Sequence, residues 1–339
     1  MKSIIKSFIL NKIYYFVREK YRYLRLFKAY KYDLNHYFKY SMGFTINKSK
    51  KKNIAEIILN THVIEKGLTM PKTKLGFGYS RLEKLIDIVT SYILKFDSID
   101  PQVLHSISVI NEYFNFHKQK GYSVNTVLIV KHLKLLEIVT LKKIHYKSRN
   151  QISIDKSKYF KFSESSFADF SNSRSSIRNF TDEVVQKEII YKVLDLARNT
   201  PSACNRQAVR VHLYTKKEQI QKILTIQGGN RGFGHLTTTL LIITFEPSLY
   251  FEESERNSGY VDGGMYCMNL LYSLHANKIA GCILNAAHNP KKDIEIRKYT
   301  NLPDSESFVA MIACGMTPSN FKVAMSYRYP LSYILKDHS

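Results

Sequence analysis

Apolar residues in the first half of the chain recur at helical spacing. In residues 54–68, 80–95, 102–119 and 126–145 they return every three or four positions, which is typical of helices with one buried face. The pattern therefore predicts four helices that pack on one another. Residues 47–53 are polar and rich in lysine, and we interpret them as a linker that precedes the first of these helices.

From residue 166 the pattern changes to helices that alternate with strands. Residues 208–214 alternate apolar and polar positions, as a half-buried strand does, whereas 237–245 and 307–316 are more continuously apolar and predict buried strands. Helices are predicted over 185–196 and 262–278, the second of which is apolar on most faces. This mixture indicates a domain with a central sheet covered by helices.

Charge divides the chain into the same two parts. The formal net charge is +23, of which residues 1–160 carry +19 (30 Lys and Arg against 11 Asp and Glu). Residues 161–339 carry +4 (21 against 17). The polar stretch 146–165 shows neither the helical nor the strand periodicity and is the expected domain boundary. We expect a basic helical region, 1–160, followed by a near-neutral domain, 161–339, with a core of its own.

The first 52 residues are basic and aromatic. Ile5, Ile9, Ile13 and Phe16 recur at helical spacing between lysines and arginines. A helix lying on an anionic membrane surface explains this pattern, and a helix docked on its own domain with a solvated basic face explains it equally well. No run of 18 uncharged apolar residues is present, so no membrane-spanning helix is expected.

Several other classes of function lack their signatures. The four cysteines all lie in the second half, without a CxxC pair: Cys204, Cys267, Cys282 and Cys314. This usage indicates reduced thiols in a cytoplasmic protein. His62 and Glu65 do not have the HExxH spacing of a zinc site, and no metal is expected. No helix-turn-helix, zinc or RNA-binding signature accompanies the basic charge, which disfavours nucleic acid as a partner.

Four polar stretches interrupt or flank the apolar elements: RSSIR (174–178), PSACNRQ (201–207), GGNRGFG (228–234) and MSYR (325–328). If the first stretch is extended, the side chains of its two arginines and Ser176 leave the same side of the backbone. Guanidinium groups suit phosphate or carboxylate, and the Asn and Gln amides elsewhere both donate and accept. The glycines do not match GxGxxG after a strand, which excludes a Rossmann dinucleotide site.

The order and spacing of these stretches resemble the nitroreductase family of FMN-dependent oxidoreductases over about residues 166–336. The opening RSSIRNF (174–180), the Pro-Ser-x-x-Asn-x-Gln pattern of PSACNRQ and the late SYR (326–328) carry the resemblance. It implies an α+β fold with a central, mostly antiparallel sheet flanked by helices. It does not cover residues 1–160.

The resemblance also implies an FMN site that is shared across a homodimer interface. The residues implied for the phosphate and ribityl chain are Arg174, Ser175, Ser176, Arg178, Ser326 and Arg328. A loop from the partner subunit is implied to line the flavin with Pro201, Ser202, Ala203, Asn205 and, nearby, Gln207. The residues implied at the pyrimidine edge are Asn230 and Arg231, the latter as a basic group. A segment near flavin N5 and O4 matches Asn285, Ala286 and Ala287, although it departs from the family's common acidic-Gly pair.

The implied activity is a ping-pong reaction in which NAD(P)H reduces FMN, and FMN then reduces a second small molecule. No side chain is expected to act as a catalytic nucleophile, because the flavin carries the hydride chemistry. The alternative is a membrane-peripheral flavin-binding protein with weak or no turnover. We also expect residues 161–339 to bind FMN in the absence of residues 1–160. If they do not, the helical region is part of the catalytic domain, and the segment HVIEKGLTMPKTKLGFG (62–78) is the first candidate for a cap over the site.

Overall fold

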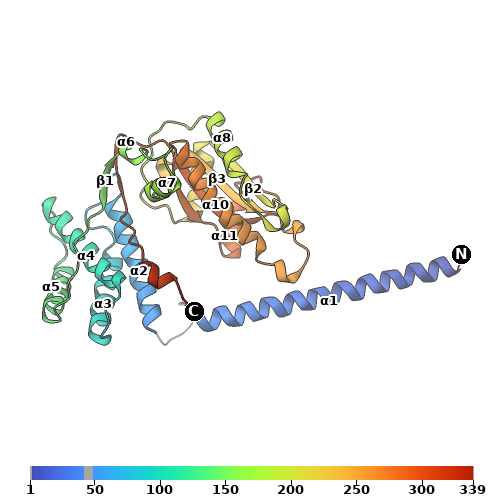
Figure 1. The fold of residues 1–339 in the computed structure, drawn as a ribbon, viewed down its shortest axis with the longest axis horizontal. Helices are drawn as coiled ribbons and strands as arrows, with labels where there is room; N and C mark the ends of the chain where they lie inside the picture. The colour runs from blue at the N-terminus through green and yellow to red at the C-terminus, as the bar shows by residue number, and fades with distance from the viewer. Residues whose placement is uncertain (1, 42–48, 339) are drawn as a thin grey trace.

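The computed structural model describes residues 2–41 and 49–338, with side chains from Lys12 onward in the first of these segments (Figure 1). The four helices predicted from the apolar pattern are all present. They are α2 (Lys50–Leu68), α3 (Tyr79–Lys95), α4 (Pro101–Gln119) and α5 (Thr126–Leu141). They pack around a common core that includes the fully buried Ile57, Leu85, Ile107 and Leu135. Because α2 already begins at Lys50, the end of the predicted linker is helical.

Helix α1 (Lys2–Tyr40) is a long rod (Figure 1), and its middle is held to the second region by ion pairs of Arg25 with Glu253 and of Asp33 with Arg256. Two of the residues that suggested an apolar face, Ile5 and Ile9, lie outside the described side chains. The other two, Ile13 and Phe16, are 55% and 60% exposed, so the contacts that hold α1 to the second region leave these apolar side chains uncovered. Among the residues the structure describes, no helix is both long and apolar enough to cross a membrane.

A four-stranded antiparallel sheet lies at the centre of the second region. Its order is β2 (Val209–Tyr214), β3 (Thr239–Phe245), β5 (Ser307–Gly315) and β4 (Ala280–Asn285). The three strands predicted from the pattern are confirmed, whereas β4 was not predicted. Every residue of β3 is buried, in agreement with its continuous apolar sequence. The sheet and its flanking helices confirm the predicted α+β class.

Helices cover both faces of this sheet. The helices of the second region are α7 (Phe167–Ser173), α8 (Lys187–Ala197), α9 (Lys217–Gln227), α10 (Ser258–Ala276), α11 (Pro290–Arg297) and α12 (Leu331–Ile334). Helices α8 and α10 pack on one face, where Ile190 and Leu270 contact residues of β3 and β5. Helices α9 and α11 pack on the other through Ile223 and Ile296. The two central strands, β3 and β5, therefore bury side chains on both sides, whereas Ile283 of the edge strand β4 is exposed.

The predicted boundary at 146–165 is not an unstructured linker. It contains β1 (Ile152–Asp155) and the short helix α6 (Lys156–Tyr159). Strand β1 pairs antiparallel with β6 (Asn320–Val323), with Ile152 opposite Val323. A strand from the region 1–160 is thus completed by a strand near the C-terminus, because hydrogen bonding between strands is independent of their separation in sequence.

Candidate cofactor site

The segment RSSIR (174–178) runs extended beside the edge strand β4. The backbone N–H of Ile177 donates to the carbonyl oxygen of Gly281 at 3.2 Å, and that of Thr181 donates to Met316 at 2.8 Å. The Ile177 side chain is fully buried in the core between the sheet and α9. Alternation along an extended segment predicts that Arg174 and Arg178 leave the side opposite Ile177.

Both arginines of this segment lack a counter-charge. Arg178 is only 8% exposed, and the Nη1 atom of Arg174 is buried without a hydrogen-bond partner. Within the described part of the chain, no carboxylate lies within 4.0 Å of either guanidinium group. An unpaired buried charge is destabilising unless a group of opposite charge binds to it. The arrangement therefore favours an anion between these side chains.

A third cation, Lys66 of α2, lies close to Arg178 and to Cys282 of β4. Burial and the charge of Arg178 lower the pKa of its ammonium group. All three cations also act on the thiol of Cys282 in β4: burial raises the pKa of that thiol, and the charges of Arg178, Lys66 and Arg174 oppose the increase. Reasoning from sequence missed Lys66, because no local pattern connects α2 with a strand more than two hundred residues later.

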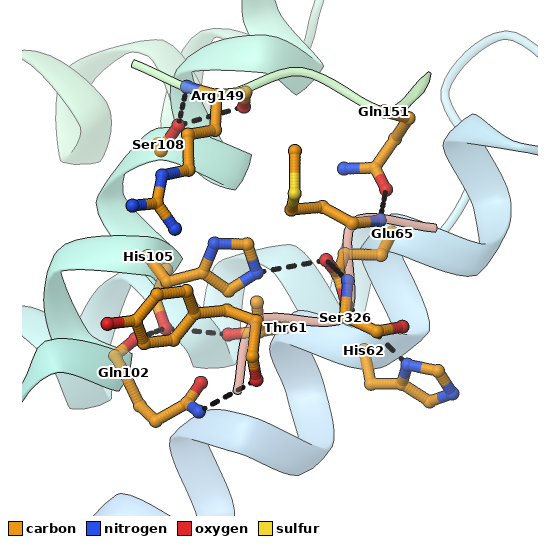
Figure 2. A network of polar contacts seen from close by, with 12 residues as sticks. Thr61, His62, Glu65, Gln102, His105, Ser108, Arg149, Gln151 and Ser326 are labelled. Atoms are coloured by element: carbon orange, nitrogen blue, oxygen red, sulfur yellow. Dashed lines mark hydrogen bonds and ion pairs between the residues drawn. The ribbon is translucent and has the colours of Figure 1, made fainter. Parts of the chain in front are cut away.

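The C-terminal tail is held by the helical region, as Figure 2 shows. The backbone N–H of Ser326 donates to Oε1 of Glu65 at 3.2 Å, and Nε2 of His105 lies 2.9 Å from the same oxygen. Nδ1 of His62 is 3.6 Å from the other carboxylate oxygen. Burial opposes ionisation of Glu65, but the hydrogen bonds and charges of the two histidines outweigh it and lower its pKa to about 2.

The residues on either side of Ser326 are held in the same way. Met325 N–H donates to Oε1 of Gln151 at 2.8 Å, and Nε2 of Gln102 donates to the Tyr327 carbonyl at 3.2 Å. Arg328, in contrast, is exposed and donates to the Ser326 carbonyl at 2.8 Å. The structure therefore places Ser326 against α2 and α4, and it shows no hydrogen bond or ion pair from Arg328 to RSSIR among the described residues.

Two other predicted segments are joined by Gln227, a residue that the sequence did not single out. Its Nε2 donates to the carbonyl of Asn285 at 3.0 Å, and its Oε1 accepts from Nδ2 of Asn230 at 3.1 Å. In the segment after β4, Ala287 N–H donates to Oδ1 of Asn285 at 2.9 Å, and Ala286 is buried in the core. Arg231, the predicted basic group of this part, is exposed.

The loop 201–207 has an unusual backbone. Within it, Cys204, Asn205 and Gln207 have φ values of 51°, 55° and 51°, and Ser326 in the tail has 45°. These four account for most of the six non-glycine residues with positive φ in the described part of the chain. Side chains rarely tolerate this conformation, which is concentrated at functional sites. The strain therefore falls mainly in segments that the sequence assigned to cofactor binding.

Side chains outside the loop hold it in this conformation. Both carboxylate oxygens of Asp262 accept from the Ala203 N–H, at 3.1 and 3.2 Å, and Tyr250 OH donates to the same carboxylate at 2.9 Å. Burial and this carboxylate raise the pKa of Tyr250 to about 12. Arg206 pairs with Glu255, which fixes the loop to the turn 253–255. Pro201, Asn205 and Gln207 themselves are exposed, and Ser202 and Ala203 are half-buried.

The loop 201–207 and RSSIR lie at opposite edges of the sheet. The loop leads into β2, whereas RSSIR contacts β4, three strands away in the order β2-β3-β5-β4. At the usual strand spacing, this separates the two edges by about 14 Å. No hydrogen bond or ion pair connects the two segments among the residues described. One chain therefore presents the two halves of the predicted site in different places.

Comparison with known protein families gives a match to the part of the chain that contains both RSSIR and the loop 201–207. Residues 172–229 match the family model described as the Nitroreductase family. The matched segment includes RSSIR and PSACNRQ, so the predicted resemblance to the nitroreductases, a family of oxidoreductases, is confirmed there. No curated protein matches the chain. No group of three or more His, Cys, Asp or Glu side chains that could hold a metal is found among the described residues.

Solved nitroreductase structures are similar to about half of the chain. An FMN-dependent nitroreductase from Clostridium difficile R20291 is 19% identical with a TM-score of 0.41, and the match covers 48% of this chain and 92% of that one. A nitroreductase family protein from Clostridium difficile 630 is 22% identical with a TM-score of 0.42, covering 51% of this chain and 98% of that one.

Proposed function

We propose that the chain is an FMN-dependent oxidoreductase and that Arg174 and Arg178 bind the anionic part of FMN. The observation that carries this proposal is the buried Nη1 of Arg174, which has no hydrogen-bond partner, together with the almost fully buried Arg178, which has no carboxylate partner among the described residues. Both lie in the segment that matches the nitroreductase family. A phosphate dianion accepts several charge-assisted hydrogen bonds from guanidinium groups and removes the cost of burying them.

The other residues of the site suit the rest of the cofactor. Nδ2 of Asn230 donates to the Leu224 carbonyl and to Oε1 of Gln227, which leaves its Oδ1 as an acceptor for a heterocycle edge. The turn at Asn285–Ala287 presents backbone groups at the end of β4. When bound, FMN supplies the hydride chemistry, with NAD(P)H as the proposed donor and an unidentified small molecule as the acceptor. The chain's residues bind and orient it.

The separation of the loop 201–207 from RSSIR supports a homodimeric site. Because the two lie at opposite edges of the sheet in one chain, a second copy is the natural source of a loop that reaches the cofactor held by Arg174 and Arg178. The exposed, strained backbone of Cys204, Asn205 and Gln207 is fixed from behind by Asp262 and is available to a partner. We therefore propose two shared sites per dimer.

Cofactor binding is tested on the purified full-length protein by its flavin absorbance and by fluorescence titration with FMN and riboflavin. Arg174→Ala is expected to weaken FMN binding by about 1.5–3 kcal/mol, roughly 10- to 100-fold, and to leave riboflavin binding almost unchanged. Arg198→Ala is the matched control, because Arg198 is exposed and pairs with the equally exposed Asp195 at the end of α8. Anaerobic addition of NADH or NADPH should bleach the bound flavin. Failure of the parent protein to bind FMN overturns the proposal.

A second candidate function, peripheral membrane attachment, is favoured by α1. Its residues 12–40 carry eight lysines and arginines against two acidic residues. Its aromatic side chains are broadly exposed, for example Tyr15 at 62% and Tyr23 at 66%. Basic and aromatic side chains on one helix suit the headgroup region of an anionic bilayer. This attachment is compatible with the oxidoreductase and does not replace it.

A further inference from the structure

We propose that Lys66 of α2 binds the same anionic cofactor as Arg174 and Arg178, so that the helical region forms part of the cofactor site. The inference rests on the proposed function and extends it to a part of the chain that lies outside the family match. The ligand chemistry is a negative charge on the flavin cofactor. That charge is either the phosphate group or the ring system in its reduced form.

The position of α2 supports this assignment, since its C-terminal turns contact several of the segments assigned to the cofactor. Glu65 accepts from the backbone of Ser326 in the tail. Met70, just beyond the helix, lies against Gly232 so closely that a Cβ atom there would be 2.9 Å from its sulfur. Lys66 lies between these two contacts in sequence, beside Arg178 and Cys282. The helix end therefore lies where these segments meet.

The end of α2 is held rigidly in this place. The carboxylate of Glu65 is fixed by His105, and Gly67 packs so tightly on the ring of Phe77 that a side chain at this position would collide with it. Successive residues of a helix point about 100° apart, so the side chain of Lys66 leaves the helix in a different direction from that of Glu65. A cation carried on such a fixed helix turn is preorganised for a ligand.

The charge of Lys66 is also uncompensated. Within the described residues, no carboxylate lies within 4.0 Å of its ammonium group, and the adjacent Glu65 is paired with His105 and His62. Burial and the like charge of Arg178 both lower the pKa of Lys66. Three partly or largely buried cations repel one another when the site holds no anion, and a bound anion converts this repulsion into attraction.

The test uses the full-length protein with Lys66→Met, which keeps the apolar stem and removes the charge. Lys72→Met is the matched control, because Lys72 is exposed in the loop that follows α2. Lys66→Met is expected to weaken FMN binding about 10- to 100-fold by fluorescence titration, and Lys66→Arg to restore part of it. Without cofactor, Lys66→Met should unfold at the same or a higher temperature than the parent, because a like-charge repulsion is removed.

Riboflavin, which lacks the phosphate group, distinguishes binding of Lys66 to the phosphate from binding to the reduced ring. If Lys66 binds the phosphate, riboflavin affinity is the same in parent and variant. If it binds the reduced ring, the variant lowers the midpoint potential of both bound flavins. Unchanged FMN affinity and unchanged potential in Lys66→Met, together with weakened binding in Arg174→Ala, overturn this inference and leave the proposed function standing. Unchanged binding in both variants overturns the proposed function as well.

Discussion

Glu65 accepts a hydrogen bond from the backbone N–H of Ser326 at 3.2 Å, which joins α2 to a residue 261 positions later in the chain. The same carboxylate is held by His105 from α4. Together with the pairing of β1 and β6, this contact makes the helical region and the C-terminal tail parts of one structure. Ser326, which the sequence assigned to the cofactor, is therefore positioned by the helices.

We predict that Glu65→Gln destabilises the protein and loosens the tail. The variant keeps the shape of the side chain but loses the charge that strengthens the bonds from Ser326 and His105. The free energy of unfolding in urea should fall by about 1.5–3 kcal/mol, the range for hydrogen bonds to a charged group. Trypsin should also cleave faster after Arg328, as measured by mass spectrometry of the digest.

Glu83→Gln is the control for this variant, because Glu83 makes a partly exposed ion pair with Lys131 on the helix surface. Its effect should stay within about 1 kcal/mol. Equal stabilities of Glu65→Gln and the parent, with equal cleavage rates after Arg328, contradict the role assigned to Glu65.

We predict a loss of stability in acid that depends on Glu65. Its pKa is lowered from 4.5 to about 2 in the folded protein. A carboxyl group with a lowered folded pKa contributes stability that is fully present above its unfolded pKa and is lost as the pH falls toward the folded value. The difference in unfolding free energy between parent and Glu65→Gln should therefore shrink from about pH 5 to pH 2. A difference that stays constant over this range contradicts the prediction.

We predict that flavin retention depends on protein concentration. If the loop 201–207 of one copy completes the site of the other, dilution to monomers should release FMN, which is detected by recovery of flavin fluorescence. Asp262→Asn removes the charge that holds the Ala203 N–H, and it should shift this release to higher protein concentration. Asp195→Asn is the control, since Asp195 is exposed on α8. A monomer that retains FMN fully contradicts a shared site.

We predict that the full-length protein binds anionic vesicles through α1. Binding to phosphatidylserine-containing vesicles should be strong at low salt and weaken as ionic strength rises, with neutral phosphatidylcholine vesicles as the control. Replacing the exposed Arg18, Lys20 and Lys28 by Gln should cost about 1 kcal/mol of binding per charge. Flotation measures the bound fraction, and a triple variant that binds as the parent does excludes α1 as the attachment site.

Local pattern was sufficient for most elements of the fold. The alternation of 208–214 and the apolar runs 237–245 and 307–316 predicted β2, β3 and β5. The reason is that the order of apolar and polar side chains along a strand shows which of its faces are buried. The helical periods of the first half predicted α2 to α5 for the same reason.

The features that pattern could not supply all depend on contacts between distant residues. Strand β1 lies in a polar stretch without a clear period, and its pairing with β6 arises from tertiary packing. Gln227 joins Asn230 to Asn285, and Lys66 reaches Arg178 from a helix outside the family match. Periodicity reports which side of an element is buried, but it does not report which other element covers that side. These side chains, including the three cations Lys66, Arg174 and Arg178, come together only when the chain folds.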